Sequence, residues 1–171
     1  MKITFNLITL ALLSLFACQQ NDEPASGKTT LKLTFNGVTR VYSDARFSEG
    51  KLGSISSITV NAGSSGADYL SLSVYGSGAG TYPYKQDMAD YHGVSQVEYK
   101  INGKLFNNYF AKICPAESGY YSTTGQIKID EYVAGKRAKG TFTGALLDAH
   151  SEDECNPSPN SFSGEFDITL P

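Results

Sequence analysis

Apolar and polar residues alternate with a period of two along most of this chain, and that pattern limits the fold more than any other feature. Leu31, Leu33 and Phe35, for example, are separated by polar residues. Successive side chains of a β-strand point to opposite faces, whereas one face of a helix repeats every 3.6 residues. The alternation therefore predicts strands that bury one face each. Strands are expected at residues 31–35, 38–42, 56–62, 69–75, 97–101, 104–111, 126–132, 138–147 and 161–170.

Turn signals separate the predicted strands. Asn36-Gly37 and Asn102-Gly103 are the pairs best suited to a two-residue hairpin turn, because both residues tolerate a positive φ. Residues 148–160 are charged and contain two prolines, which predicts a loop, and residues 85–92 have a weak helical tendency. Short strands with frequent turns are typical of antiparallel sheets. We therefore expect an all-β fold, an antiparallel β-sandwich or barrel-like single domain.

The first 17 residues have the features of a cleaved signal peptide. Lys2 supplies a positive charge, an apolar run follows, and Ala17 is a small residue before the expected cut. The run is shorter than the stretch of about 20 apolar residues that a transmembrane helix needs. Leu15-Phe16-Ala17-Cys18 resembles the bacterial lipobox, in which the cysteine receives a diacylglycerol, although Ser, Ala or Thr is commoner in the place of Phe16. A transmembrane helix and a signal peptide without lipidation are the alternatives.

The lipobox resemblance implies a mature protein that begins at lipidated Cys18 and is held at a membrane by its lipid. Residues 18–28 are mostly polar or small, which predicts a flexible tether before an all-β domain over 29–171. Residues 19–23 resemble the acidic export signal of Bacteroidota surface lipoproteins, with an ordinary solvated tether as the alternative. These features predict a location in the bacterial cell envelope, at the outer membrane, with surface exposure if the export signal acts.

Two cysteines remain once Cys18 carries a lipid. Disulfides persist in oxidising compartments, and an even count favours a bridge between Cys114 and Cys155. Such a bridge would close a loop with 40 residues between the cysteines and stabilise the fold by at most roughly 4 kcal/mol. Two free thiols are the alternative. The formal net charge of −3 comes without a basic cluster, so we expect no nucleic-acid partner.

Two segments near the end of the chain carry a further resemblance. Gly125-Gln-Ile-Lys-Ile-Asp-Glu-Tyr132 is followed, after a turn, by Gly135-Lys-Arg-Ala-Lys-Gly-Thr-Phe-Thr-Gly144. This pattern resembles one in small Bacteroidota lipoproteins of unknown function, which also carry an earlier Gly-Thr-Tyr, here Gly80-Thr81-Tyr82. The resemblance covers about the last two-thirds of the chain. It implies an all-β lipoprotein domain and brings no activity, substrate or catalytic residue with it.

The sequence contains no recognisable catalytic or metal-binding motif. His92 and His150 are the two histidines, and the Gly-x-Ser-x-Gly nucleophile motif is absent. The oxygen-rich residues 148–155 lack the spacing and glycine of an EF-hand, so a solvated loop is favoured over a calcium site. We therefore expect no catalytic residue, no metal and no cofactor. The scattered acids are expected to be solvated, namely Asp87, Asp90, Asp130, Glu131 and Glu165.

Aromatic residues are abundant, with 11 Tyr and 9 Phe but no Trp. Tyrosine is enriched at binding surfaces, but it is also a favoured strand residue. The candidate binding surface comprises Tyr82, Tyr84, Tyr91, Tyr120 and Tyr121. Sugar-binding faces usually recruit Trp, so its absence weakens a glycan-binding interpretation.

The predicted function is a non-catalytic cell-envelope domain that binds a ligand or protein partner, or acts as an accessory subunit. The alternatives are a small-ligand carrier with an internal apolar cavity and an envelope hydrolase with an unrecognised site.

Overall fold

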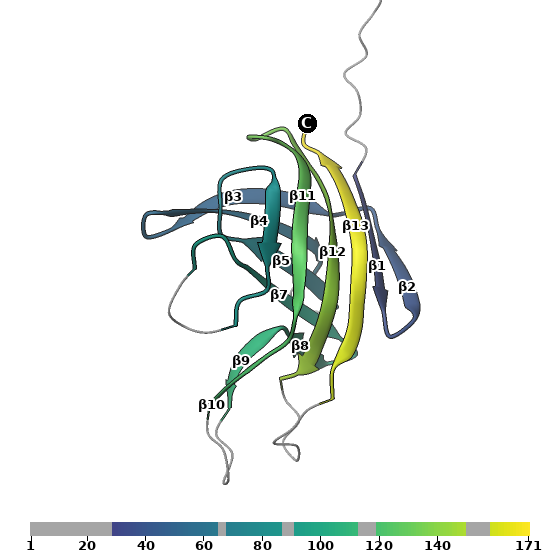
Figure 1. Cartoon of the computed structure of the whole chain (residues 1–171). Helices are drawn as coiled ribbons and strands as arrows, with labels where there is room; N and C mark the ends of the chain where they lie inside the picture. Colours follow the sequence, from purple (N-terminus) through teal and green to yellow (C-terminus); the bar gives the residue numbers. More distant parts are fainter. Residues whose placement is uncertain (1–28, 65–67, 87–90, 113–118, 150–157) are drawn as a thin grey trace, which may run out of the picture.

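The computed structural model describes residues 29–64, 68–86, 91–112, 119–149 and 158–171 (Figure 1). These residues form antiparallel β-strands joined by turns and loops, which confirms the all-β fold. The strands are β1 (Thr30–Phe35), β2 (Val38–Tyr42), β3 (Arg46–Leu52), β4 (Ile55–Gly63), β5 (Tyr69–Val74), β6 (Gly80–Pro83), β7 (Ser95–Ile101), β8 (Lys104–Asn107), β9 (Tyr109–Lys112), β10 (Gly119–Ser122), β11 (Gly125–Val133), β12 (Arg137–Asp148) and β13 (Asn160–Thr169).

Eleven of the described strands form one continuous sheet, and nine of them follow the order β2-β1-β13-β12-β8-β7-β5-β4-β3. Strand β11 pairs with β12 beside this path, β6 pairs with β11, and β9 and β10 form a separate hairpin. The sheet curls over into a half-barrel, so that β3, β4 and β5 lie behind β11, β12 and β13 (Figure 1). The back half comprises β3, β4, β5, β7 and β8, and the front half comprises β11, β12 and β13. The architecture is therefore barrel-like, made from one curled sheet.

Strand β12 belongs to both halves of the curled sheet. Most of its length pairs with β13, and with β11 on its other side. Near its end, Leu147 pairs with Asn107 and Asp148 pairs with Phe106 of β8. The pairing of β11 with β12 does not reach beyond Gly144, so β8 occupies the same edge of β12 further along. One 12-residue strand thus connects the front of the half-barrel to the back.

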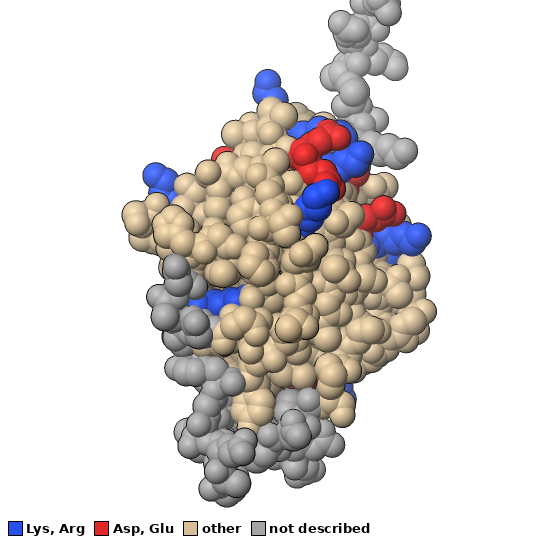
Figure 2. Space-filling model, in the orientation of Figure 1, with Lys and Arg blue, Asp and Glu red and all other residues tan. Residues whose placement is uncertain are grey.

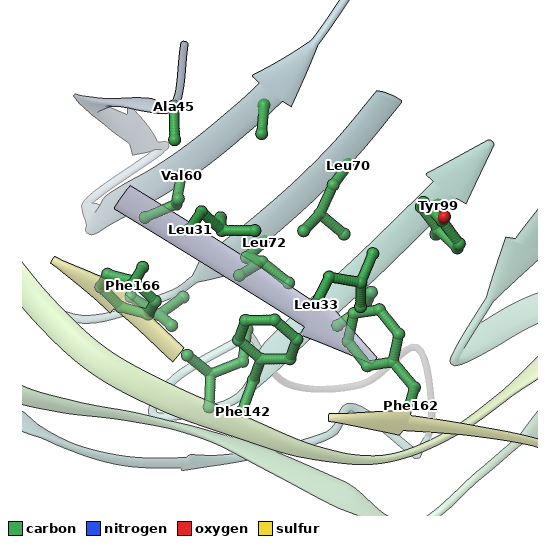
Figure 3. Packing of buried hydrophobic residues seen from close by; sticks show 14 of the residues in the cluster. Leu31, Leu33, Ala45, Val60, Leu70, Leu72, Tyr99, Phe142, Phe162 and Phe166 are labelled. Atoms are coloured by element: carbon green, nitrogen blue, oxygen red, sulfur yellow. The ribbon is translucent and has the colours of Figure 1, made fainter. Parts of the chain in front are cut away.

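Apolar side chains fill the concave side of the sheet, as the alternating pattern predicts. Leu31 and Leu33 of β1 are fully buried between the two halves. Phe35 packs edge-to-face on Tyr99 and Phe106, with ring centroids 5.1 and 4.9 Å apart. Figure 3 shows the contributions of the two halves, with Phe142, Phe162 and Phe166 from the front strands and Val60, Leu70 and Leu72 from the back strands.

Two glycines make room for two phenylalanines in the neighbouring strands β12 and β13. Gly140 lies opposite Phe166, and Phe142 lies opposite Gly164. A Cβ at Gly164 would lie 2.4 Å from Cζ of Phe142, and one at Gly140 would lie 2.7 Å from Cζ of Phe166. Each ring therefore covers the glycine of the other strand. This reciprocal packing gives the Gly-Thr-Phe segment of the sequence a structural explanation.

The structure confirms both predicted Asn-Gly hairpins. Asn36 and Asn102 have φ values of 47° and 52°, and the glycines that follow them also have positive φ. The sequence-based prediction missed β3, β6 and β10, and it wrongly merged β8 and β9 into one strand. Residues 85, 86, 91 and 92 are not helical, and the rest of the suggested helical turn lies outside the described residues.

Candidate functional site

The outer face of the back half carries polar residues in register across five strands. Arg46 lies opposite Asn61, Asn61 opposite Ser71, Ser71 opposite Glu98, and Glu98 opposite Asn107. These five residues, one each from β3, β4, β5, β7 and β8, are called the polar row below. They face outward because their strand neighbours are the buried residues of the core.

One end of the polar row opens into a hollow of about 190 Å³, called the polar hollow below. It lies where β5, β7 and β8 meet the start of β9. Hydroxyl, amide and carboxylate groups dominate its lining, which suits a polar rather than an apolar occupant. The lining residues are Ser71, Ser73, Gln96, Val97, Glu98, Asn107, Asn108 and Tyr109.

The chain leaves the main sheet at Asn108, which separates β8 from β9. The side-chain Oδ1 of Asn108 accepts a hydrogen bond from the backbone N–H of Val97 at 2.6 Å, and its backbone carbonyl accepts one from the N–H of Thr123 at 2.9 Å. The side-chain amide thus takes the place of a backbone carbonyl in the pairing with β7. An N–H donor on Oδ1 also fixes the orientation of the amide, so Nδ2 is the free end.

Two polar atoms of the polar hollow lack a hydrogen-bond partner within the described part of the chain. They are Nδ2 of Asn108, a residue that is 1% exposed, and Oδ1 of the adjacent Asn107. An unsatisfied buried polar group costs about 1–3 kcal/mol, so native proteins keep few of them. One of these atoms is a donor and the other is an acceptor. Asn107 and Asn108 thus bring both kinds of hydrogen-bonding group to the lining of the hollow.

Tyrosine hydroxyls hold two other groups of this face in place. The hydroxyl of Tyr69 donates a hydrogen bond to Oε1 of Glu98, and that of Tyr75 donates to Oε1 of Gln96 at 2.7 Å. The hydrogen bond to Glu98 raises the pKa of Tyr69 to about 12, with burial and the negative charge of Glu98 adding to the rise. Tyr69 therefore stays protonated at neutral pH and keeps donating to Glu98, whose Oε2 is left for other partners.

Tyr82 and Tyr84 do not lie on a binding surface, contrary to the sequence-based expectation. They are 8% and 2% exposed, respectively, and belong to the core. The alternation of the short strand β6 turns Tyr82 inward, where its hydroxyl donates to the carbonyl of Gly78 at 2.7 Å. The ring of Tyr84 lies over Gly125 and Gly144, which are directly opposite each other. Both rings are therefore structural.

Of the other candidate tyrosines, Tyr91 is linked through Lys85 to Tyr109, a tyrosine that lines the polar hollow. Tyr91 is half-buried and packs edge-to-face on Tyr75, with ring centroids 4.9 Å apart. The buried Lys85 places Nζ 3.9 Å from the ring centroid of Tyr91 and 5.5 Å from that of Tyr109. Lys85 thereby links the two rings, and Tyr109 forms one wall of the hollow.

Tyr121 packs on Phe110 in a stacked arrangement, with ring centroids 5.6 Å apart, on the hairpin β9–β10. The side chain of Tyr120 lies outside the described residues. The predicted surface is therefore not a single patch. Tyr69 and Tyr75, which do hold the polar face, were missed as site residues. The alternation of 69–75 does place them on one face with Ser71 and Ser73, and that signal was available in the sequence.

The outer face of the front half carries charged residues that are paired and solvated. Arg137 contacts Glu131 at 3.0 Å and Asp167 at 3.2 Å, and Lys128 contacts Asp130 at 2.6 Å. Figure 2 shows such charges gathered towards one end of this face. The hydrogen bond from Arg137 lowers the pKa of Glu131, a carboxyl that remains exposed. Exposed ion pairs contribute little stability, and this face is not the candidate site.

Several predicted features fall outside the described residues. Cys18, Cys114, Cys155 and His150 all do, so lipid attachment and the disulfide stay predictions. Within the described ranges, no three His, Cys, Asp or Glu residues are grouped in a way that would hold a metal ion. The same ranges contain no helix with the length and apolar character needed to cross a bilayer.

The two segments that carry the family resemblance form one hairpin. Residues 125–132 belong to β11, and residues 135–144 supply the turn and the first part of β12. The polar row and the polar hollow lie on other strands, so the resemblance describes the scaffold. No protein-family model matches the sequence, and no curated protein or solved structure is significantly similar to it.

Proposed function

We propose that this domain is a non-catalytic binding module for a small polar ligand, carried by a lipoprotein of the bacterial cell envelope. The observation behind the proposal is the lining of the polar hollow, which is rich in hydroxyl, amide and carboxylate groups and includes the incompletely satisfied Asn107 and Asn108. A ligand hydroxyl complements such a lining, because its oxygen accepts a hydrogen bond while its hydrogen is donated. An amide group does the same with its carbonyl and N–H.

The size of the polar hollow limits the part of the ligand that it holds. Its volume of about 190 Å³ is below the roughly 300–1,000 Å³ of pockets for drug-sized molecules. It therefore suits one small unit, such as a single sugar ring. Its lining offers little apolar surface, so affinity has to come from hydrogen bonds rather than from burial of apolar groups.

The envelope part of the proposal depends on the start of the sequence. Lys2, the apolar run and the Leu15-Phe16-Ala17-Cys18 segment support export and lipid attachment. More than one acyl chain would hold the protein firmly, because a single chain binds membranes only marginally. The intact mass of the mature protein should correspond to an acylated chain that begins at Cys18. A mass that places the cut elsewhere would exclude the anchor.

The binding part is tested by Asn107→Leu. This change removes an unsatisfied acceptor, so the free energy of unfolding should stay the same or rise, whereas ligand binding should fall. Neutral monosaccharides such as glucose, mannose and N-acetylglucosamine serve as probes. Their binding is measured by the shift of the side-chain amide signal of Asn108 in nuclear magnetic resonance spectra. Thr141→Leu, on the exposed face of the front half, is the matched control.

Two outcomes would contradict the binding proposal. One is an Asn108 amide signal that no probe shifts. The other is equal binding by the Asn107→Leu variant and the unchanged protein. The carrier and hydrolase alternatives stay predictions, and the geometry described above favours neither of them.

A further inference from the structure

A second hollow adjoins the polar hollow on the same face. Its volume is about 520 Å³, and it shares Ser71 and Glu98 with the polar hollow. Arg46 and Asn61 line its far side, towards the edge of the sheet at β3. The two hollows therefore form one groove, called the outer groove below, which follows the polar row.

The outer groove crosses the strands rather than running along them. Neighbouring strands are about 4.8 Å apart, so the four intervals from Arg46 to Asn107 span about 19 Å. One polar side chain stands on each strand, at nearly constant spacing. That spacing is comparable to the rise of one pyranose unit in an extended 1,4-linked chain. A linear sugar chain laid in the groove would place about one unit over each strand.

The groups of the polar row suit an uncharged, hydroxyl-rich ligand. Asn61, Ser71 and Asn107 offer amides and a hydroxyl, each of which can pair with a sugar hydroxyl. Glu98 has Oε1 engaged by Tyr69, which leaves Oε2 to accept a hydrogen bond from the ligand. The charges of Arg46 at one end and Glu98 near the other are opposite. A polyanion would meet Glu98 unfavourably, and a polycation would meet Arg46 unfavourably.

We infer that the outer groove binds a linear, neutral oligosaccharide, with its units lying across strands β3 to β8. The inference rests on the proposed function and extends it from one unit to a chain. The sequence contains no Trp, so the groove lacks the largest aromatic side chain for stacking and each unit contributes little. Affinity accumulates with the number of units, and chain length is the variable that tests the idea.

The test is a calorimetric titration of the mature chain with sugars of increasing length. The probes are extended β-1,4-linked series, namely cello-, manno- and N-acetylchito-oligosaccharides of one, two and four units. Maltotetraose, whose α-1,4 links curl the chain, is the control for shape. In at least one extended series, the tetrasaccharide should bind about tenfold more tightly than the disaccharide, as expected for one or two added hydrogen bonds. Maltotetraose should bind no more tightly than maltose.

Two matched variants distinguish the contribution of the second hollow to binding from that of the polar hollow. Asn61→Leu, in the second hollow, should weaken binding of the tetrasaccharide about 3- to 10-fold and leave monosaccharide binding unchanged. Asn107→Leu should weaken binding of both. Monosaccharide binding without any gain from chain length would overturn the groove inference and leave the proposed function intact. If no sugar of any length binds, both the groove inference and the proposed function are contradicted. Equal effects of Asn61→Leu on short and long sugars would also overturn the inference.

Discussion

The oxygen and the nitrogen of the Asn108 side-chain amide have different roles. Oδ1 completes the pairing of the sheet with Val97, and the buried Nδ2 has no partner in the described chain. A substitution here would disturb the fold and the site together. Asn107 contributes to the hollow without holding the sheet through its side chain, which makes it the better probe of binding. At the scale of single residues, the polar face is therefore a set of groups whose structural and binding roles can be separated.

The pair of Tyr69 and Glu98 gives a prediction about alkaline pH. The pKa of Tyr69 is raised from its ordinary value of 10.0 to about 12, chiefly by its hydrogen bond to Glu98. The bond therefore stabilises the fold below pH 10, and this contribution is lost as the pH rises from 10 to about 12. Glu98→Gln removes the negative charge, so the pKa of Tyr69 should fall towards 10. Ultraviolet absorbance of tyrosinate should show one group titrating earlier.

Glu165→Gln is the control for that titration, because Glu165 is an exposed acid on the outer face of the front half. It should leave the tyrosinate curve unchanged. Identical curves for the Glu98→Gln variant and the unchanged protein would show that the hydrogen bond between Tyr69 and Glu98 does not form in solution.

At the scale of the strands, the close contact between β12 and β13 depends on the glycine–phenylalanine pairs. The backbone carbonyl of Lys32 lies 2.1 Å from the position of a Cβ at Gly164, and Cζ of Phe142 lies 2.4 Å from it. Distances this short cannot be relieved by one side-chain movement, because one of the neighbours is backbone. The pairing of β1, β13 and β12 thus requires glycine at this position.

Gly164→Ala should therefore destabilise the fold by about 1–3 kcal/mol, the usual cost of overpacking a core. Urea unfolding at neutral pH measures the change. Gly78→Ala is the matched control, because the nearest atom to a Cβ there is 4.0 Å away, and it should change stability by less than about 0.5 kcal/mol. Equal stability of the Gly164→Ala variant and the control would contradict the packing described for β12 and β13.

The local sequence of each strand and turn explains which strands were predictable. The hairpins at Asn36-Gly37 and Asn102-Gly103 depend on local turn chemistry, and both were correct. Strand β3 was missed because only Phe47 in it is buried, so it has no alternation to detect. The break at Asn108 was missed because a side-chain amide replaces a backbone group, which leaves the local pattern intact.

The candidate site was less predictable than the fold, for a physical reason. The polar row gathers residues from five strands, and their juxtaposition depends on the register of pairing between strands distant in sequence. A single sequence shows alternation within a strand but not which residue lies opposite on the next strand. The tyrosine hypothesis failed at Tyr82 and Tyr84 because nearby glycines suggested a loop, whereas the rings pack into the core.

For the whole molecule, the sheet joins the first strand to the last. β1 pairs with β13 along its entire length, and β2 pairs with β1. β13 also contributes Phe162, Phe166 and Ile168 to the core. Contacts between residues so far apart in sequence form late and slowly, because closing a long loop costs entropy. The sheet is therefore incomplete until the end of the chain has joined it.

A chain that ends at Pro159 should consequently fail to fold. It lacks β13, so the β1–β2 hairpin loses its neighbour and β12 loses one of its two edges. Near-ultraviolet circular dichroism and thermal unfolding should show neither fixed aromatic packing nor a cooperative transition. Removal of residues 1–28 is the control and should preserve both signals. A cooperative transition in the shortened chain would show that β13 is dispensable.

The same pairing also determines which end of the half-barrel lies nearest to the point where the chain enters the fold. The chain enters the fold at Thr30, which pairs with Asp167, and Asp167 pairs with Lys139 of β12. Asn107 in the polar hollow pairs with Leu147, eight residues further along β12, or roughly 26 Å away along the strand. Anchored through Cys18, the domain would hold its polar hollow at the distal end. If the predicted anchor forms, that standoff would leave the hollow within reach of large, immobile polymers outside the bilayer.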